Sequence, residues 1–122
     1  MNYKYQGENS LRSLYASAND PSVSYVIVRP GGLADGPADG ATAIELNQGD
    51  TIAGEINRAD VAQCVAAAAI SKTLPPNVTF EVYESDRSGP LESKYSSKSG
   101  LERNGALLNG DYDEMFKGLK SD

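Results

Sequence analysis

The chain has 122 residues and a net charge of −6, from 11 basic and 17 acidic side chains, and 39% of its residues are apolar. This length fits one domain with one hydrophobic core. An acidic surface repels phosphate backbones and anionic lipids, so nucleic acids and membrane surfaces are not expected partners. The single Cys and the absence of His exclude an internal disulfide, a Cys-based zinc cage, and catalysis by Ser-His-Asp or Cys-His groups.

No apolar run approaches the roughly 20 residues that span a bilayer, and residues 1–10 contain no hydrophobic segment of a signal peptide. We therefore expect a soluble protein that is neither inserted in a membrane nor secreted. No repeat of fixed period is visible, so a solenoid or a propeller is not expected.

The first predicted element is an amphipathic helix over residues 3–18. Its apolar residues recur at three- and four-residue spacing and would share one face. Charged residues four apart would form a solvated ladder on another face. The Asn-Asp-Pro sequence at 19–21 ends the helix, because Pro disfavours helical backbone in the residue before it. The apolar set is Gly7, Leu11, Leu14, Tyr15 and Ala18, and the charged set is Lys4, Glu8 and Arg12.

A strand is predicted over residues 23–29 (VSYVIVR), because β-branched and aromatic residues dominate it. Its apolar run is continuous rather than alternating, which predicts a strand covered on both faces. Residues 33–43 follow as a loop rich in Gly, Asp, Ala and Pro. Two short extended pieces, 42–46 and 51–56, flank the turn sequence NQGD, and this arrangement predicts a β-hairpin.

Residues 58–70 predict a buried helix, because apolar side chains surround it almost completely. Asn57 is a natural N-cap, Asp60 places a carboxylate in the first turn, and Cys64 is interpreted as a small core residue. Residues 78–84 (VTFEVYE) alternate as a strand with one half-buried face.

Residues 85–111 are rich in Ser, Gly, Lys and Glu and predict an irregular arm, and residues 113–119 predict a short terminal helix. The order of elements predicts an α/β fold with a parallel layer. Two principal strands are few for a sheet, so the strand at 23–29 is expected to expose an edge and the chain to form part of a larger layer. We expect a partial α/β region at 1–84 and the arm with its helix at 85–122.

Three stretches occur in an order and at a spacing that resemble a known family. They are KYQGE at 4–8, SYVIVRPGGL at 24–33 and INRADVA at 56–62, and TFEV at 79–82 fits the strand that follows. Together they are similar to the C-terminal half of the atypical short-chain dehydrogenases, in the NmrA-like group of NAD(P)-binding Rossmann-fold proteins. The resemblance covers residues 3–84, and the order of the stretches carries more weight than any one of them.

The resemblance implies the C-terminal portion of a Rossmann-like doubly wound parallel sheet, with the short β-hairpin and the irregular arm added. It implies NAD(P) as the cofactor, with Lys4 as the catalytic lysine and as a contact of the nicotinamide ribose. Pro30, Gly31, Gly32 and Leu33 would pass beside the nicotinamide, where the missing Cβ of Gly lets backbone approach a flat ring. No metal is expected, because the loop carboxylates lack metal-loop spacing and are interpreted as turn residues: Asp35, Asp39 and Asp50.

The sequence departs from the family pattern at the two places that carry its chemistry. No Gly-x-Gly-x-x-Gly turn, the family's clamp for the pyrophosphate, is present. The family's catalytic Tyr sits four residues before the Lys, which is a position before Met1, and Tyr3 and Tyr5 point elsewhere on a helix. We therefore expect this chain by itself to lack the cofactor clamp and the proton donor, so NAD(P) is implied by the resemblance alone.

Three functional hypotheses follow. The first is the substrate-side portion of an NAD(P)-dependent oxidoreductase or NAD(P)-sensing protein. The second is a non-catalytic binding or assembly module that docks on a protein partner, or on another copy of itself, through its open sheet edge. The third is a truncated product with no independent activity. The family has plastid and cytosolic members, so the resemblance leaves both compartments open.

Overall fold

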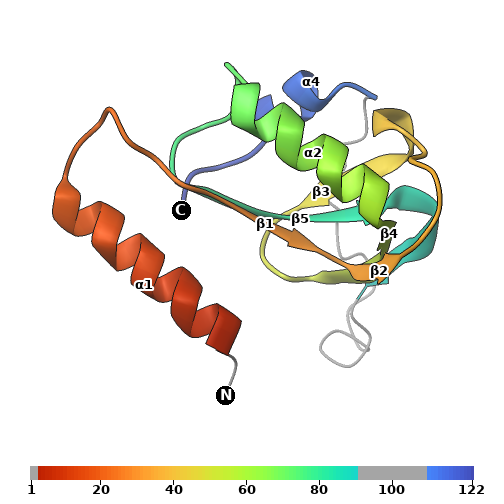
Figure 1. Ribbon diagram of the computed structural model, residues 1–122, viewed down its shortest axis with the longest axis horizontal. Coiled ribbons are helices and arrows are strands. Elements are labelled where there is room, and N and C mark those ends of the chain that lie inside the picture. The colour runs from red at the N-terminus through yellow and green to blue at the C-terminus, as the bar shows by residue number, and fades with distance from the viewer. Residues whose placement is uncertain (1–2, 91–109) are drawn as a thin grey trace.

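The computed structural model describes residues 3–90 and 110–122 (Figure 1). The described residues form three α-helices, α1 (Tyr3–Ala18), α2 (Arg58–Ile70) and α4 (Tyr112–Lys117), and two 3₁₀ turns, η1 (Ala41–Ala43) and η2 (Ser85–Arg87). The strands are β1 (Val26–Pro30), β2 (Gly32–Ala34), β3 (Ile44–Asn47), β4 (Ile52–Asn57), β5 (Val78–Glu84) and β6 (Ser88–Pro90). None of the helices in these ranges has the length and apolar character to cross a bilayer.

The strands form two small sheets that combine parallel and antiparallel pairs. One sheet has the order β1-β5-β3 and the other β2-β4-β6. β1 runs parallel to β5 and β2 parallel to β4, whereas β3 and β6 run antiparallel to their neighbours. The connection between β1 and its parallel partner passes through α2, as in α/β folds. This confirms the α/β class and the partial Rossmann-like layer that the sequence predicts.

The predicted β-hairpin is wrong in its pairing, although both of its strands form. β3 pairs with β5 and not with β4, which places Ile44 and Leu46 in the core. The turn after β3 has Gly49 at φ 92° and Asp50 at φ 55°, and the backbone N–H of Asp50 donates to the Glu81 carboxylate. The turn residues predict that the chain reverses, but the unpaired edge of β5 offers β3 the ladder of hydrogen bonds that decides its place.

β5 is the central strand, and all seven of its residues are buried. Successive side chains of a strand point to opposite faces. Val78, Phe80 and Val82 face the hydrophobic core with α2 and α4, and Thr79 and Glu81 face the other side. The sequence predicted one half-buried face here and two covered faces for β1, which is the reverse of what is observed. β1 is exposed or half-buried, because it lies at an edge of the described sheet.

α2 packs one side against the core and leaves the other open. Figure 1 shows it lying across β1 and β5, with α4 beside it. Cys64 is fully buried, which confirms its predicted core role, but burial of the whole helix is wrong: Val65 is 46% and Ile70 is 82% exposed. Much of the apolar composition of α2 comes from Ala, which is favoured in helices by intrinsic propensity and does not require burial.

The terminal helix predicted at 113–119 is confirmed by α4. Met115 and Phe116 are fully buried, and the ring of Phe116 lies 5.8 Å from that of Phe80 on β5. Residues near the end of the chain therefore help to close the core over the central strand. Most of the irregular arm predicted at 85–111 lies outside the described residues, and its beginning forms η2 and β6.

The chain crosses from the first sheet to the second at Gly31, where no side chain fits. A Cβ on Gly31 would lie 2.4 Å from the carbonyl oxygen of Gly54 and 2.6 Å from Cδ1 of Tyr83. A Cβ on Gly54 would lie 2.7 Å from the carbonyl oxygen of Arg87. The N–H of Gly31 donates to the carbonyl of Val82 at 3.2 Å, which fixes the backbone in this close approach. The absence of a side chain at Gly31 thus serves the packing of the two sheets.

We expect Gly31→Ala to lower the free energy of unfolding by about 1–3 kcal/mol or more, because the new methyl group overlaps backbone that cannot retreat. Gly32→Ala is the matched control, since its Cβ would meet Glu55 Cγ at an ordinary 3.7 Å. The control should change stability by less than about 0.5 kcal/mol. Urea unfolding of the two variants checks this, and equal losses would contradict the packing role of Gly31.

Candidate functional site

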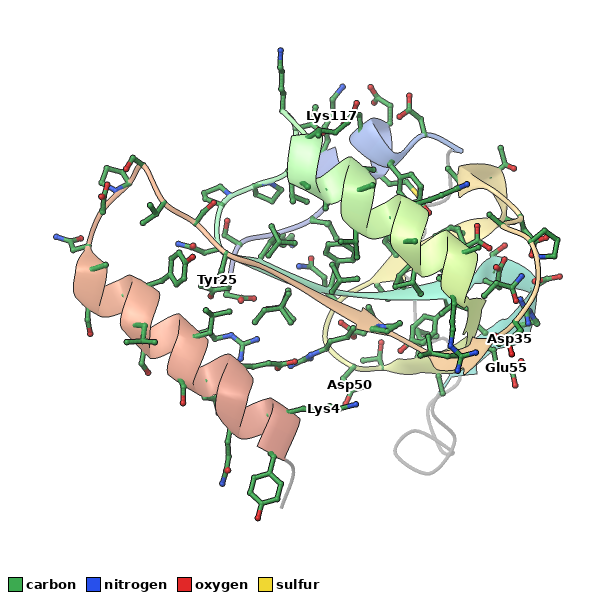
Figure 2. The ribbon with its side chains drawn as sticks, in the orientation of Figure 1. Lys4, Tyr25, Asp35, Asp50, Glu55 and Lys117 are labelled. Atoms are coloured by element: carbon green, nitrogen blue, oxygen red, sulfur yellow. The ribbon has the colours of Figure 1, made fainter. Side chains whose placement is uncertain are left out.

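A polar cleft of about 650 Å³ lies between α1 and the sheet. Figure 2 shows Lys4, on the first turn of α1, reaching toward the turn between β3 and β4 where Asp50 lies. The cleft is lined by equal numbers of basic and acidic side chains. The described lining residues are Lys4, Tyr5, Glu8, Arg12, Arg29, Gly49, Asp50 and Asp122.

Charged rather than apolar side chains attach α1 to the sheet. None of its 16 residues is buried. Glu8 binds the guanidinium of Arg29 through both carboxylate oxygens, with Oε1 3.0 Å from Nε. One turn later, Arg12 donates from Nη2 to Thr79 Oγ1 at 2.8 Å and from Nε to Asp122 Oδ2 at 3.2 Å. The Glu8–Arg29 pair is bidentate, and bidentate pairs are both stronger and more directional than single hydrogen bonds.

The face that α1 turns to the sheet differs from the sequence-based expectation. Its half-buried residues are Glu8, Leu11, Arg12 and Tyr15, at the spacing of one helix face. Leu14, which was expected on the inner face, is 68% exposed. The strands opposite present charged and hydroxyl groups, so the stripe predicted to be a solvated ladder points inward instead.

Asp122 joins α1, β5 and the segment before β1 through one carboxylate oxygen. Its Oδ2 accepts from Thr79 Oγ1 at 2.7 Å and from the Tyr25 hydroxyl at 2.9 Å, besides Arg12. The ring of Tyr25 also packs edge-on against Tyr15 of α1, with centroids 5.3 Å apart. Burial raises the pKa of Asp122, but the hydrogen bonds it accepts outweigh this and lower the pKa overall. The carboxylate therefore stays ionised as the common acceptor of this network.

Glu8 and Arg29 stabilise each other's charge. The hydrogen bond between them lowers the pKa of Glu8 and raises the pKa of Arg29. Glu81 is the register partner of Arg29 on β5, and burial raises the pKa of Glu81 while the N–H of Asp50 opposes that rise. Both cleft arginines, Arg12 and Arg29, are thus held by carboxylates and are not presented to an external phosphate.

The structure places the predicted site residues in two groups. Lys4 lines the cleft together with Arg29, the next-to-last residue of β1. Residues 30–33 do not line this cleft. Gly31 is packed against the second sheet, and Leu33 is 49% exposed. The geometry brings Lys4 beside the end of β1 but does not bring residues 30–33 into the same cleft.

Sequence reasoning missed Glu8, Arg29 and Asp122 as residues that shape the cleft. Arg29 is a lone charge at the end of an apolar strand, and such a charge signals an ionic partner. Glu8 stands at helical spacing from Arg12, but their spacing does not tell which way the helix turns. Asp122 lies 110 positions from Arg12, so no local pattern could connect them.

The described residues do not fit the pyrophosphate of a dinucleotide. Such a site needs a Gly-rich turn whose backbone N–H groups open a helix. α2 begins directly after β4, and the side chain of its cap, Asn57, is occupied by the carbonyl of Pro37 and by Arg87, each at 3.1 Å. The cleft arginines are neutralised by carboxylates. We therefore derive no chemical step through a dinucleotide from these residues.

Residues 3–72 match the model of a protein family described as NAD(P)H-binding. The match covers more than half of the chain and runs from α1 past the end of α2, so it includes Lys4, residues 30–33 and the junction of β4 with α2. Searches of curated proteins and of solved structures give no match to the chain.

We expect acid to loosen the attachment of α1. The folded pKa values of Glu8 and Asp122 lie below their ordinary values of 4.5 and 3.8, so their stabilisation is present above those values and is lost as pH falls through the lowered ones. Glu8→Gln should lower the melting temperature by a few degrees, about 2–6 °C, at pH 7 and flatten its decline toward pH 3. Asp35→Asn, at a side chain that is 90% exposed, is the control. Thermal unfolding across this range checks the prediction, and parallel curves for wild type and Glu8→Gln would contradict it.

Proposed function

The chain belongs to the NAD(P)H-binding family, and we propose that it forms the nicotinamide and substrate side of an NAD(P)H-dependent oxidoreductase related to the atypical short-chain dehydrogenases. The observation that carries this proposal is where the family match lies. Residues 3–72 include every described residue that lines the cleft except Asp122. All but one of the residues that line the polar cleft therefore lie within the matched segment.

Lys4 is the residue that we propose meets the cofactor. It is exposed on the wall of the cleft, at the first position of the stretch KYQGE that resembles the family's lysine motif. The last residue of that stretch, Glu8, is held by Arg29, and this contact fixes the helix face that presents Lys4. NAD(P)H supplies hydride transfer when bound, and the role proposed for Lys4 is to hold the nicotinamide ribose in the cleft, whereas residues 30–33 lie beyond the cleft lining.

The pyrophosphate site has to come from a further segment, and we place it along the free edge of β1. On either side of β1, the carbonyl of Tyr25 accepts from the N–H of Val78 and the N–H of Gly31 donates to the carbonyl of Val82, both on β5. Backbone groups alternate sides along a strand, so those of Val26 and Val28 point to the opposite edge. A Gly-rich strand–helix unit of this polypeptide or of a partner subunit would continue the sheet there.

A second candidate function is assembly without a cofactor. The specific observation that favours it is the same unpaired edge of β1, which is the end strand of its sheet in the described part of the chain. An exposed edge accepts an added strand from another chain through main-chain hydrogen bonds. This candidate needs no dinucleotide, and a protein partner or a second copy would suffice.

NAD(P)H binding to the protein isolated from its natural source decides between these functions. We expect a native species heavier than the 12.9 kDa of this chain, and one that binds NADH or NADPH in a calorimetric titration. Lys4→Ala should weaken that binding about ten- to a hundredfold, as expected for the loss of one charge-assisted hydrogen bond of about 1.5–3 kcal/mol. Lys72→Ala, at the exposed turn after α2, is the matched control and should have no effect.

Each other outcome assigns the function differently. A heavier species that binds neither dinucleotide would favour assembly over the oxidoreductase. Binding that Lys4→Ala and Lys72→Ala leave equal would contradict the role of Lys4. A species of 12.9 kDa without binding would contradict both candidates and leave the product with no independent activity.

A further inference from the structure

Three carboxyl groups from distant parts of the sequence meet where β5 ends and α2 begins. One ligand-capable oxygen from each of Asp39, Asp60 and Glu84 lies within 4.8 Å of the other two. Asp39 comes from the loop before η1, Asp60 from the first turn of α2, and Glu84 from the last position of β5. None of them belongs to the described lining of the cleft at α1.

Asp60 is held in place by the loop that it faces. Its Oδ2 accepts the backbone N–H of Asp39 and its Oδ1 accepts the N–H of Gly40, both at 3.0 Å. The side chain is buried, so the carboxylate is fixed in direction. Each oxygen of an ionised carboxylate accepts more than one bond, so both retain capacity for a further ligand.

Glu84 supplies a second and independent observation. The residue is fully buried, and neither of its carboxylate oxygens has a hydrogen-bond partner. Nη2 of Arg87 lies 3.5 Å from Oε1, but the same guanidinium also donates to Asn57 and lies 3.5 Å from a carboxylate oxygen of Glu55. A buried carboxylate without hydrogen bonds is costly unless another group compensates it.

We propose that Asp39, Asp60 and Glu84 bind one hard divalent cation of the size of Ca²⁺, with one oxygen from each residue. Oxygen ligands are those that such cations prefer. Three carboxylates from separate elements suit Ca²⁺, whose coordination geometry is flexible, better than Mg²⁺, which demands near-ideal octahedral geometry and is usually held by one or two carboxylates. The ligand oxygens all lie within 4.8 Å of one another, close enough to share one ion.

The burial of the cluster explains how an ion would enter and what would complete its shell. Asp60 and Glu84 are buried, and Asp39 is exposed. The ion would therefore enter past Asp39 and keep water ligands on that side. The cation would offset the charge of three carboxylates for which Arg87 supplies one positive charge. This site requires no dinucleotide, so it is independent of the proposed oxidoreductase function.

A proton is the competitor for this position. Burial, followed by the neighbouring carboxyl of Asp60, raises the pKa of Glu84 to about 7. Without a cation, Glu84 near neutral pH would carry a proton for part of the time. The experiment therefore has to separate a protein that binds an ion from one that shares a proton.

Calorimetric titration of the full chain with CaCl₂, after removal of bound metal by a chelator, provides the test. We expect one Ca²⁺ per chain and a melting temperature that rises with Ca²⁺ concentration, because ligand binding to the folded state stabilises it. Asp39→Asn should weaken binding about tenfold or more without unfolding the protein, since Asp39 is exposed. Glu84→Gln should abolish the Ca²⁺ response.

Asp35→Asn is the matched control, because Asp35 lies in the same loop and outside the cluster. It should bind Ca²⁺ as the wild type does. The absence of both heat and a melting shift at about 10 mM Ca²⁺ would overturn the proposal in favour of the shared proton. Wild-type affinity in Asp39→Asn would also overturn it, even if Glu84→Gln failed to fold. An equal response to Mg²⁺ would contradict the size of the ion.

Discussion

β5 fixes the position of the other elements, because each of its two faces is covered by a different kind of contact. Its inner face carries Val78, Phe80 and Val82 into an apolar core with α2 and α4. Its outer face carries Thr79 and Glu81, which bind polar groups of α1 and of the turn after β3. Apolar burial is non-directional, whereas hydrogen bonds are directional. The first face therefore supplies stability, and the second determines where α1 and that turn lie.

The dependence of α1 on charged contacts has a consequence for the cleft. A helix that buries no side chain gains little from the hydrophobic effect, so its position follows the two arginine contacts at Glu8–Arg29 and Arg12–Asp122. The carboxylates in these contacts neutralise the two arginine side chains, which would otherwise attract a phosphate. The cleft is thus a polar site of balanced charge, suited to hydroxyl and amide groups rather than to a phosphate group.

The extent of the elements could be predicted from sequence more fully than their burial and pairing. Propensity and turn residues place α1, α2 and β5 at the observed ranges, because helix caps, Pro and periodicity are local signals. Burial is a property of neighbours: Val65 and Ile70 are apolar, but no described layer covers them. Strand pairing is also non-local, because β3 pairs with β5, with Leu46 opposite Val82, and not with β4, which follows it in the chain.

The residues proposed to be functional differ in the same way, because some follow from local sequence and others only from the fold. Lys4 and residues 30–33 belong to contiguous stretches, so a resemblance could point to them. Asp39, Asp60 and Glu84 are 21 and 24 positions apart, and metal-loop spacing cannot reveal ligands that three separate elements bring together. The signal at Glu84 is structural, because its side chain is fully buried and neither of its carboxylate oxygens accepts a hydrogen bond.

The edge of β1 that has no partner strand among residues 3–90 and 110–122 limits what can pair with it. The residues that point their backbone groups outward are Val26, Val28 and Pro30, because their odd-numbered neighbours bond to β5. Pro30 has no N–H, so the edge offers donors at Val26 and Val28 and then ends. A single added strand would gain few main-chain hydrogen bonds there. A partner that brings a helix together with its strand would gain further contacts against the exposed side of α2, where Val65 lies. Such a strand–helix unit is also the element that binds the pyrophosphate of a dinucleotide.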